Sequence, residues 1–486
     1  MKKPSFASLV LVSSLIASAA QAVDLIAIGT VSGTYEDFAT ETAFPLENGV
    51  AGNRLGGLGS GLAYAGGTTF LALPDRGPNA NAYNPLVDDT ASYIVRFQTL
   101  NLSLAPTADP ITGLPFTLTP MLIDTTLLSS HAALIYGSGT GLGNQSDGVT
   151  PLGSGAPALN AIDHTHYFTG RSDNFDATQP STNSKNARLD PEGIRVSNNG
   201  RSVFISDEYG PFVYEFDRAT GRRIRTFNLP ANLAISSLSS QSAVEIAGNT
   251  VGRVTNKGME GLAITPDGKT LVGIMQANLE QDKKKSLRIV TIDVKSGATH
   301  EYAYKLTDGS GASEIVAVNN HQFLVDERDG SGLGDTPLLT EVASPATVKK
   351  LFLIDLAGAT DVTAIAGPNA DLSAYAVSKT LFLDFVAKLN AAGVDSRLIP
   401  SKIEGVAFGQ DVEINGVTKH TLFIANDNDF LPVVADPFKL PGDATRGKIE
   451  NPNKFYVFAF ADAELPGLVP QQFKRSHDGR DADCRD

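Results

Sequence analysis

A short phrase built around glutamate recurs along the chain. Glu192, Glu260 and Glu404 are each followed by glycine in the phrases DPEGIRV, GMEGLAI and KIEGVAF, and Glu314 lies in the weaker form ASEIVAV. If each phrase opens the innermost strand of a unit that is repeated around one axis, the four carboxylates converge at one end of that axis. Like charges that close must be neutralised by protons, by basic side chains or by a cation.

A second group of polar side chains follows the next apolar run of each unit. Its members are Asp75, Asp207, Glu208, Asp326, Glu327, Asn426 and Asp427. In an antiparallel pair one strand begins at the edge where its partner ends, so the two groups share one end of the unit. We therefore expect a site for a divalent cation, Ca²⁺ in the first place, because this ion prefers carboxylate and carbonyl oxygens. The expected ligands are Asp75, Glu192, Glu208, Glu260, Glu314, Asp326, Glu327, Glu404 and Asp427.

Basic residues are interleaved with these acids. Their forked or point charges are suited to binding a phosphate ester beside a metal ion, and the expected substrate-binding residues are Arg76, Lys257, Arg328 and Lys402. The expected catalytic carboxylates are Glu192, Glu260, Glu404 and Asp207. The alternative is a structural clasp, in which each acid accepts backbone N–H groups of a neighbouring unit and does no chemistry.

These acids converge only if the chain is built from repeated units. Each glutamate phrase is followed by a turn, a second apolar run and usually two further strands, which together make a four-stranded antiparallel sheet. A single such sheet cannot cover both of its faces, whereas copies stacked around an axis bury them. We predict an all-β propeller of five to six four-stranded blades. Five units begin near residues 59, 192, 260, 314 and 404, and a sixth would lie between the first two.

The ring also has to close. Residues 23–29 form an isolated strand while the last unit lacks a fourth strand, so pairing the two would remove both exposed edges. Residues 125–188 are rich in Gly, Ser, Asn and Asp and are expected to form a long inserted loop. The strongest helical pattern covers residues 381–389. Glycines at the axis should let backbones approach closely, and these are Gly193, Gly261 and Gly405.

The composition is that of an acidic globular protein. The chain has 486 residues, 42% of them hydrophobic, and 39 basic against 53 acidic residues give a net charge of −14. Such a charge disfavours nucleic acid and anionic lipid as partners. Two N-terminal lysines, an apolar stretch and the small residues Ala20 and Ala22 predict a signal peptide over residues 1–22. We expect a periplasmic or secreted protein without a membrane span.

Removal of the leader would leave 37 basic and 53 acidic residues, a net charge of −16. Residues 23–465 are expected to form the propeller, and residues 466–486 a charged, flexible tail. Cys484 is the single cysteine, which excludes an intramolecular disulfide and a thiolate zinc site. The sequence does not indicate an oligomeric state.

The chain resembles the phytase-like family of exported bacterial proteins, which are described as having esterase-like activity of phytase. The matching phrases are LPDRGPNA from Leu73, LDPEGIRV from Leu189, FISDEYGPFVYEFD from Phe204, NKGMEGLAI from Asn256, and IEGVAF with LFIANDNDF from Ile403 onward. The resemblance implies a β-propeller and suggests hydrolysis of phosphoesters or other esters. Calcium-dependent propeller phytases hold metals with acidic residues and bind phosphate with Lys and Arg, and the acidic ring expected here is similar in type.

Three functions fit these observations. The first is an exported phosphoesterase or esterase that acts on a small-molecule ester at a metal-assisted acidic site at one end of the propeller. The second is a noncatalytic propeller that binds a ligand or serves as an envelope scaffold. The third is hydrolysis of a lactone or another ester in the same channel. None of the three identifies the substrate or ligand.

Overall fold

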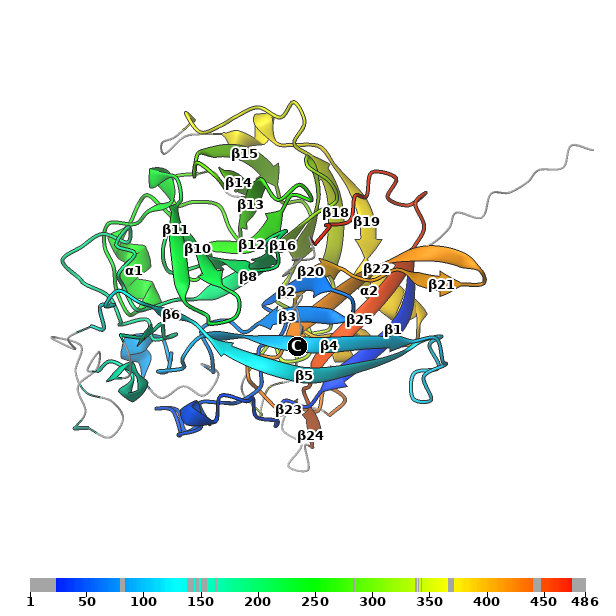
Figure 1. Cartoon of the computed structure of the whole chain (residues 1–486), viewed down its shortest axis with the longest axis horizontal. Coiled ribbons are helices and arrows are strands. Elements are labelled where there is room, and N and C mark those ends of the chain that lie inside the picture. Colours follow the sequence, from blue (N-terminus) through cyan, green and yellow to red (C-terminus); the bar gives the residue numbers. More distant parts are fainter. Residues whose placement is uncertain are drawn as a thin grey trace, which may run out of the picture.

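A computed structural model of the chain describes residues 23–78, 84–137, 144, 148–149, 155–161, 164–282, 285–336, 339, 341, 343–365, 371–439 and 447–473. Within this part of the chain, strands dominate and five four-stranded antiparallel sheets surround a common axis (Figure 1). The expected signal peptide and most of the expected tail fall outside the described residues. Across the described ranges, no helix has both the length and the apolar character needed to cross a membrane.

The five sheets are the blades of a propeller, here numbered in chain order and each given from its inner to its outer strand. Blade 1 is β2 (Gly61–Gly66), β3 (Thr69–Leu73), β4 (Arg96–Ala105) and β5 (Thr117–Leu127). Blade 2 is β8 (Pro191–Val196), β9 (Ser202–Asp207), β10 (Phe212–Asp217) and β11 (Arg223–Asn228). Blade 3 is β12 (Met259–Ile264), β13 (Thr270–Met275), β14 (Ser286–Asp293) and β15 (Thr299–Lys305). Blade 4 is β16 (Gly311–Ala317), β17 (Gln322–Arg328), β18 (Lys349–Asp355) and β19 (Lys379–Asp384). Blade 5 is β20 (Lys402–Phe408), β22 (Val417–Asp427), β25 (Asn453–Phe460) and β1 (Asp24–Val31), and β21 (Val412–Ile414) also pairs with β22.

Short elements connect the blades. Two small strand pairs are β6 (Ser129–Ser130) with β7 (His166–Tyr167) and β23 (Val433–Ala435) with β24 (Lys448–Glu450). The α-helices are α1 (Ser242–Gly248) and α2 (Phe385–Ala391). Single 3₁₀ turns are η1 (Thr40–Thr42), η2 (Pro85–Val87), η3 (Ala158–Ala161), η4 (Ala231–Leu233), η5 (Leu372–Tyr375) and η6 (Ser396–Leu398).

The inner strands form a closed ring. β2 contacts β8, β8 contacts β12, β12 contacts β16, β16 contacts β20, and β20 returns to β2. The prediction of a propeller is therefore confirmed, and the number of blades is five. Between β5 and β8 the described residues form only the β6–β7 pair and η3, so this interval supplies no sixth blade.

The N-terminal strand closes the ring. β1 pairs antiparallel with β25, with Asp24 opposite Ala459 and Val31 opposite Asn453, and thus becomes the outer strand of the last blade. This confirms the predicted closure. The arrangement satisfies the hydrogen-bonding edge of β25, which would otherwise be left open to pairing with another chain.

Apolar side chains fill the spaces between blades. At the junction of blades 5 and 1, the rings of Phe423 and Phe70 lie 4.5 Å apart between centroids and both are fully buried. Burying one such ring contributes about 2–3 kcal/mol, and every junction contains a comparable cluster. No blade covers its own faces, so each blade depends on its two neighbours for the burial of its apolar side chains.

The expected helix at residues 381–389 is wrong in its first half. Its first residues belong to β19, where Leu381 pairs with Phe352 of the neighbouring strand. Helix α2 begins only at Phe385, and the carboxylate of Asp384 caps it by accepting a hydrogen bond from the backbone N–H of Ala387 (3.0 Å). An apolar run of this kind can form a helix or a strand. Its first residues form a strand because they pair with β18 and complete blade 4.

Glycine lets the inner strands approach one another. A methyl group at Gly261 would lie 2.6 Å from the backbone nitrogen of Ile315 in the next blade, and one at Gly193 would lie 2.7 Å from that of Leu262. Both distances are shorter than a carbon–nitrogen contact allows, which confirms that glycine is needed for close packing at the axis.

We predict that Gly261→Ala destabilises the protein by about 2 kcal/mol or more, because the added methyl group meets backbone that cannot move aside without shifting blade 4. Urea unfolding followed by circular dichroism measures the change. Gly330→Ala is the matched control, since a methyl group there meets no atom within 4 Å. Equal stability of the two variants would contradict the close-packed hub.

Candidate functional site

An acidic cavity of about 120 Å³ lies at the end of the hub where the inner strands begin and their partner strands end. Six carboxylates, three basic side chains and two amides surround it. The lining residues are Asp75, Arg76, Glu192, Glu208, Asn256, Glu260, Gln276, Arg328, Lys402, Glu404 and Asp427. A volume of this size holds several water molecules or a hydrated ion, and it is smaller than the ~300–1,000 Å³ of a typical small-molecule site.

The strand register explains why these side chains meet. In blades 2 to 5 a β-bulge interrupts the start of the inner strand, and the residue after the bulge, Gly261 in blade 3, faces the second strand at Ile274. The residue before that glycine lines the cavity in three blades, as Glu192, Glu260 and Glu404. Each blade supplies one further lining residue at or just beyond the end of its second strand, as Gln276 stands two positions after Ile274 in blade 3. In blades 1 to 5 these residues are Asp75, Glu208, Gln276, Arg328 and Asp427. Both predicted groups of acids therefore supply members to one site.

Glu314 lies one register position away from the other three glutamates. It pairs with Asp326, at the position that glycine holds in the neighbouring blades, and it does not line the cavity. Its carboxylate forms an ion pair with Arg195 (3.0 Å) and accepts hydrogen bonds from the backbone N–H groups of Leu262 (3.1 Å) and Ile315 (2.9 Å). Burial raises the pKa of Glu314 to about 7, although Arg195 opposes the rise. Glu314 therefore acts as a structural clasp between blades and is not part of the cavity.

Arg195 spans the hub. From β8 its guanidinium donates hydrogen bonds to the backbone oxygens of Leu62 (2.8 Å), Ile315 (2.9 Å) and Val406 (3.4 Å), which belong to three other blades. Neither Arg195 nor Glu314 lines the acidic cavity.

Four further residues proposed from the sequence do not line the cavity: Asp207, Asp326, Glu327 and Lys257. Asp207 accepts a hydrogen bond from the backbone N–H of Tyr209 (3.0 Å). Glu327 accepts hydrogen bonds from the Tyr304 hydroxyl (2.7 Å) and the Gly309 N–H (3.0 Å). Asp326 is buried beside the cavity, and Lys257 is exposed in the turn before β12.

Ion pairs made by three basic side chains neutralise part of the cavity. Arg76 donates to Asp190 (2.5 Å), and Lys402 lies 2.8 Å from Asp427 and 2.9 Å from Asp429. Arg328 forms its closest ion pair with Glu404 and lies 3.7 Å from Glu260. Six lining carboxylates against three cations still leave an excess of negative charge.

The pKa directions reflect this excess. Burial, together with the neighbouring carboxylates, raises the pKa values of Asp75, Glu192 and Glu260 well above their ordinary values. Burial also raises the pKa of Glu208 to about 7. For Lys402, burial lowers the pKa, but Asp427 and the other nearby acids outweigh it and raise the pKa well above the ordinary value. The cavity therefore disfavours a full set of charged carboxylates.

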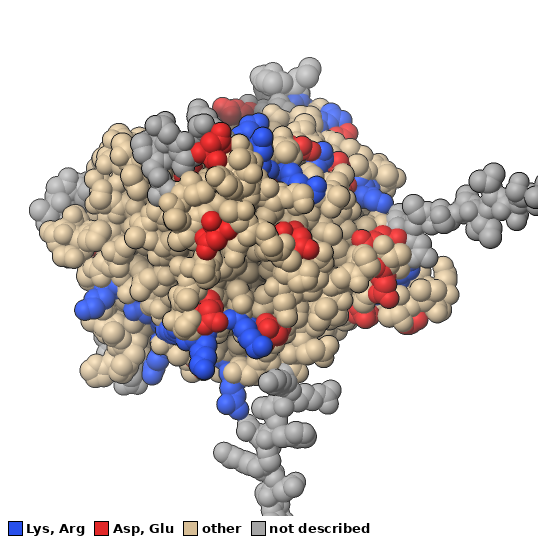
Figure 2. Space-filling model, turned by 90° about the horizontal axis from the view of Figure 1, so that it is seen from above, with Lys and Arg blue, Asp and Glu red and all other residues tan. Residues whose placement is uncertain are grey.

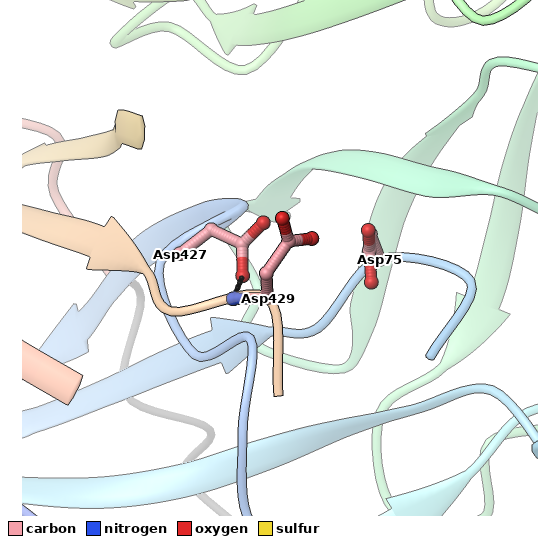
Figure 3. Close-up of side chains that lie close together, drawn as sticks. All are labelled: Asp75, Asp427 and Asp429. Atoms are coloured by element: carbon pink, nitrogen blue, oxygen red, sulfur yellow. Dashed lines mark hydrogen bonds between the residues drawn. The ribbon is translucent and has the colours of Figure 1, made fainter. Parts of the chain in front are cut away.

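Three groups of carboxylates are close enough to share a metal ion. Within each group the ligand oxygens lie within 4.8 Å of one another, and the groups are Asp75–Asp427–Asp429, Asp75–Asp190–Glu192 and Glu192–Glu208–Glu260. Figure 3 shows the first group, in which the backbone N–H of Asp429 donates to the carboxylate of Asp427 (2.6 Å). The groups overlap through Asp75 and Glu192 and form one continuous acidic arc.

Sequence reasoning missed four residues of the site. Asp190 and Asp429 stand two places from predicted ligands, in the phrases LDPEGIRV and NDNDF, and this proximity was the signal that could have found them. Gln276 occupies in blade 3 the position that carries a charged residue in the other blades. Asn256 has a left-handed backbone conformation (φ 57°) and accepts a hydrogen bond from Arg76. No sequence pattern predicts this contact.

The outer surface differs from the cavity. On the face shown in Figure 2, acidic and basic residues are interspersed among uncharged ones. The dense acidic grouping belongs to buried side chains, since Glu192, Glu260 and Glu404 are each at least nine-tenths buried.

Comparison with known proteins agrees with the fold and the repeated phrases. The family model described as phytase-like, esterase-like activity of phytase, matches residues 53–430. The chain belongs to the phytase-like family. A curated relative of this phytase-like chain, an uncharacterized secreted protein of Arthroderma benhamiae, is 27% identical over 454 residues, which cover 78% of this chain and 84% of that protein.

Solved structures with some likeness to the chain include hydrazine synthase of Kuenenia stuttgartiensis, with 11% identity, a TM-score of 0.29, and coverage of 77% of this chain and 78% of that one. Another is a Bacteroides uniformis protein described as a 6-phosphogluconolactonase, with 12% identity, a TM-score of 0.27, and coverage of 82% and 88%. TM-scores this low support no inference about this phytase-like chain.

We predict that Arg195→Met destabilises this phytase-like protein by about 3–5 kcal/mol, because it leaves Glu314 buried without its ion-pair partner. The double variant Arg195→Met/Glu314→Gln should recover part of the loss. Urea unfolding at pH 7 measures both. A single variant as stable as the parent would show that the pair does not hold the hub, and the exposed Arg397–Asp395 pair offers a control, Arg397→Met, that should change little.

We predict that the protein without divalent cations loses stability, relative to Glu208→Gln, as the pH rises from 5 to 8. The pKa of Glu208 is raised in the folded state to about 7, so the fold binds this proton more tightly than the unfolded chain does. The resulting stabilisation is complete below pH 4 and disappears as the pH passes 7. Thermal unfolding in chelator measures the difference, and a parent protein that gains on the variant with rising pH would overturn the assignment.

Proposed function

We propose that this chain is an exported hydrolase of phosphoric or related esters that acts at the acidic cavity with a divalent cation, Ca²⁺ in the first place. The observation that carries the proposal is the gathering of six carboxylates and three basic side chains, from all five blades, in one cavity of about 120 Å³. Membership of the phytase-like family supports an ester substrate, and the secreted relative supports export.

The residues of the cavity fit a cation. The carboxylates exceed the basic groups, and one oxygen of Glu260, Oε2, is buried without a hydrogen-bond partner. When bound, a divalent cation supplies Lewis acidity toward a phosphoryl or carbonyl oxygen. Oxygen ligands of this kind suit Ca²⁺ or Mg²⁺.

The basic side chains would bind the substrate's negative charge. The buried guanidinium nitrogens Nε of Arg76 and Arg328 have no hydrogen-bond partner, so each retains a donor for an anionic ester. Asn256 and Asp190 hold the Arg76 guanidinium on one side of the cavity, and Glu404 holds that of Arg328 on the other.

A carboxylate of the cavity would take the proton of the attacking water. Glu404 lines the cavity outside the group Glu192–Glu208–Glu260, and burial raises its pKa, which favours the uptake of a proton. The ion pair with Arg328 fixes this carboxylate in place. The cavity volume of about 120 Å³ would admit only the reacting group of the substrate, and the remainder would stay outside.

A noncatalytic binding or scaffold propeller is the second candidate. The ion pairs Arg76–Asp190 and Arg328–Glu404 favour it, because they join neighbouring blades as structural clasps, and Lys402–Asp427 joins two strands of blade 5. Hydrolysis of a lactone or a carboxylic ester at the same cavity is a variant of the first candidate.

We predict that the purified protein hydrolyses phytate or p-nitrophenyl phosphate with Ca²⁺ and loses this activity in EDTA. Glu192→Gln should lower the rate by roughly 100-fold, because it removes a charged oxygen from the proposed cation site. Asp124→Asn, at an exposed acid of β5, is the matched control and should keep the parent's rate.

The release of phosphate, followed over time, measures the rates, and p-nitrophenyl acetate tests the carboxylic ester. If no ester is hydrolysed in Ca²⁺, Mg²⁺, Mn²⁺ or Zn²⁺, the proposal fails and the binding function is favoured. Hydrolysis of the acetate alone would replace the phosphoester by a carboxylic ester.

A further inference from the structure

We infer that the cavity takes one divalent cation, held by Glu192, Glu208 and Glu260, and that side-chain cations already occupy the two neighbouring carboxylate groups. The inference deepens the proposed function and rests on it for the role of the ion. It assigns different tasks to three acidic groups that are alike in composition and spacing.

In the group Asp75–Asp427–Asp429, the place of a cation is taken by Lys402. Its ammonium nitrogen lies 2.8 Å from Oδ2 of Asp427 and 2.9 Å from Oδ1 of Asp429. Lys402 comes from the first residue of β20, so the inner strand of blade 5 itself delivers the charge. A metal ion cannot enter this group without displacing the ammonium of Lys402 from the two carboxylates.

In the group Asp75–Asp190–Glu192, the charge of Asp190 is already compensated. Asp190 is fully buried and binds Arg76 twice, through the guanidinium (2.5 Å) and through the backbone N–H (3.1 Å). The remaining carboxylate of Asp75 accepts the N–H of Gly77 (3.0 Å). Only Glu192 in this group is left without a partner.

The group Glu192–Glu208–Glu260 is different. Among the described residues, no hydrogen bond or ion pair reaches the carboxylate of Glu192, which is 7% exposed and lines the cavity. Glu260 accepts from Gln276 (2.7 Å) through Oε1, while its Oε2 is buried without a partner. The carboxylate of Glu208 accepts a hydrogen bond from the backbone N–H of Gly258 (3.0 Å), and the guanidinium of Arg76 lies farther away, at 3.9 Å.

Two independent observations thus point to this group. The first is the spacing of its oxygens, within 4.8 Å of one another, and the second is the unpartnered, nine-tenths buried carboxylate oxygens that line the cavity. Uncompensated buried carboxylates are costly, and a divalent cation with water molecules in the cavity would satisfy them. Three glutamates of blades 2 and 3 then provide the site, and Gln276 supports it without adding charge.

The replacement of a metal by Lys402 makes a sharp prediction. Removing the ammonium while keeping the chain length, as in Lys402→Met, should free the group Asp75–Asp427–Asp429 for a second cation. The parent protein, freed of metal with chelator and desalted, should bind one Ca²⁺ per chain in isothermal titration calorimetry, and Lys402→Met should bind two.

Two variants with the same change of charge separate the groups. Glu260→Gln should weaken the binding of Ca²⁺ at least tenfold, because it removes a ligand. Asp429→Asn, in the group that Lys402 occupies, should leave the affinity of the parent site within threefold. In thermal unfolding, Ca²⁺ should raise the midpoint of the parent and of Asp429→Asn but not that of Glu192→Gln, which also covers the case that Lys402→Met does not fold.

The inference is overturned if the parent binds no Ca²⁺ or more than one ion, or if Glu260→Gln binds as the parent does. If Lys402→Met folds and still binds one ion, the claim that the Lys402 ammonium takes the place of a metal ion is wrong. Binding of one ion without hydrolysis of any ester leaves the site in place and removes the proposed function. Hydrolysis that continues in EDTA, without measurable Ca²⁺ binding, removes the site and keeps a hydrolase.

Discussion

The ion pair between Arg195 and Glu314 is the contact on which the arrangement of the hub depends. Arg195 reaches from blade 2 to backbone oxygens of blades 1, 4 and 5, and Glu314 accepts backbone N–H groups of blades 3 and 4. Two side chains thereby join the inner strands of all five blades. Polar backbone groups and charges therefore satisfy one another where the inner strands meet.

Repetition provides the positions of the site, and departures from repetition provide its chemistry. The place before the hub glycine is glutamate in blades 2, 3 and 5 and serine, Ser60 or Ser313, in blades 1 and 4. The place after the second strand carries Asp75, Glu208, Gln276, Arg328 and Asp427 in turn. A fully symmetric ring of acids would repel itself, whereas in this sequence Arg76, Arg328 and Lys402 lie among the acids and form ion pairs with them.

Much of this was accessible from the sequence, for identifiable reasons. The repeated phrase has a fixed spacing to its following strand, so the propeller, its N-terminal closure and the shared end of both acid groups could be predicted. The place of Glu314 could not, because the phrase ASEIVAV looks like its relatives although its glutamate stands at the position that glycine holds in blades 3 and 5. The contacts of Asp190 and Asn256 with Arg76 join loops that are 114 and 180 residues apart, and such pairs leave no local pattern.

The pairing of β1 with β25 has a consequence for the order in which the chain matures. The first and the last of the described strands pair with each other, with Asp24 opposite Ala459. Forming this pair closes a loop that contains almost the whole chain, and such long-range contacts form slowly. All strands of blades 1 to 4 precede β25 along the chain, whereas blade 5 lacks its third strand until β25 has been made. The ring is complete only when β25, the last of the described strands along the chain, has paired with β1.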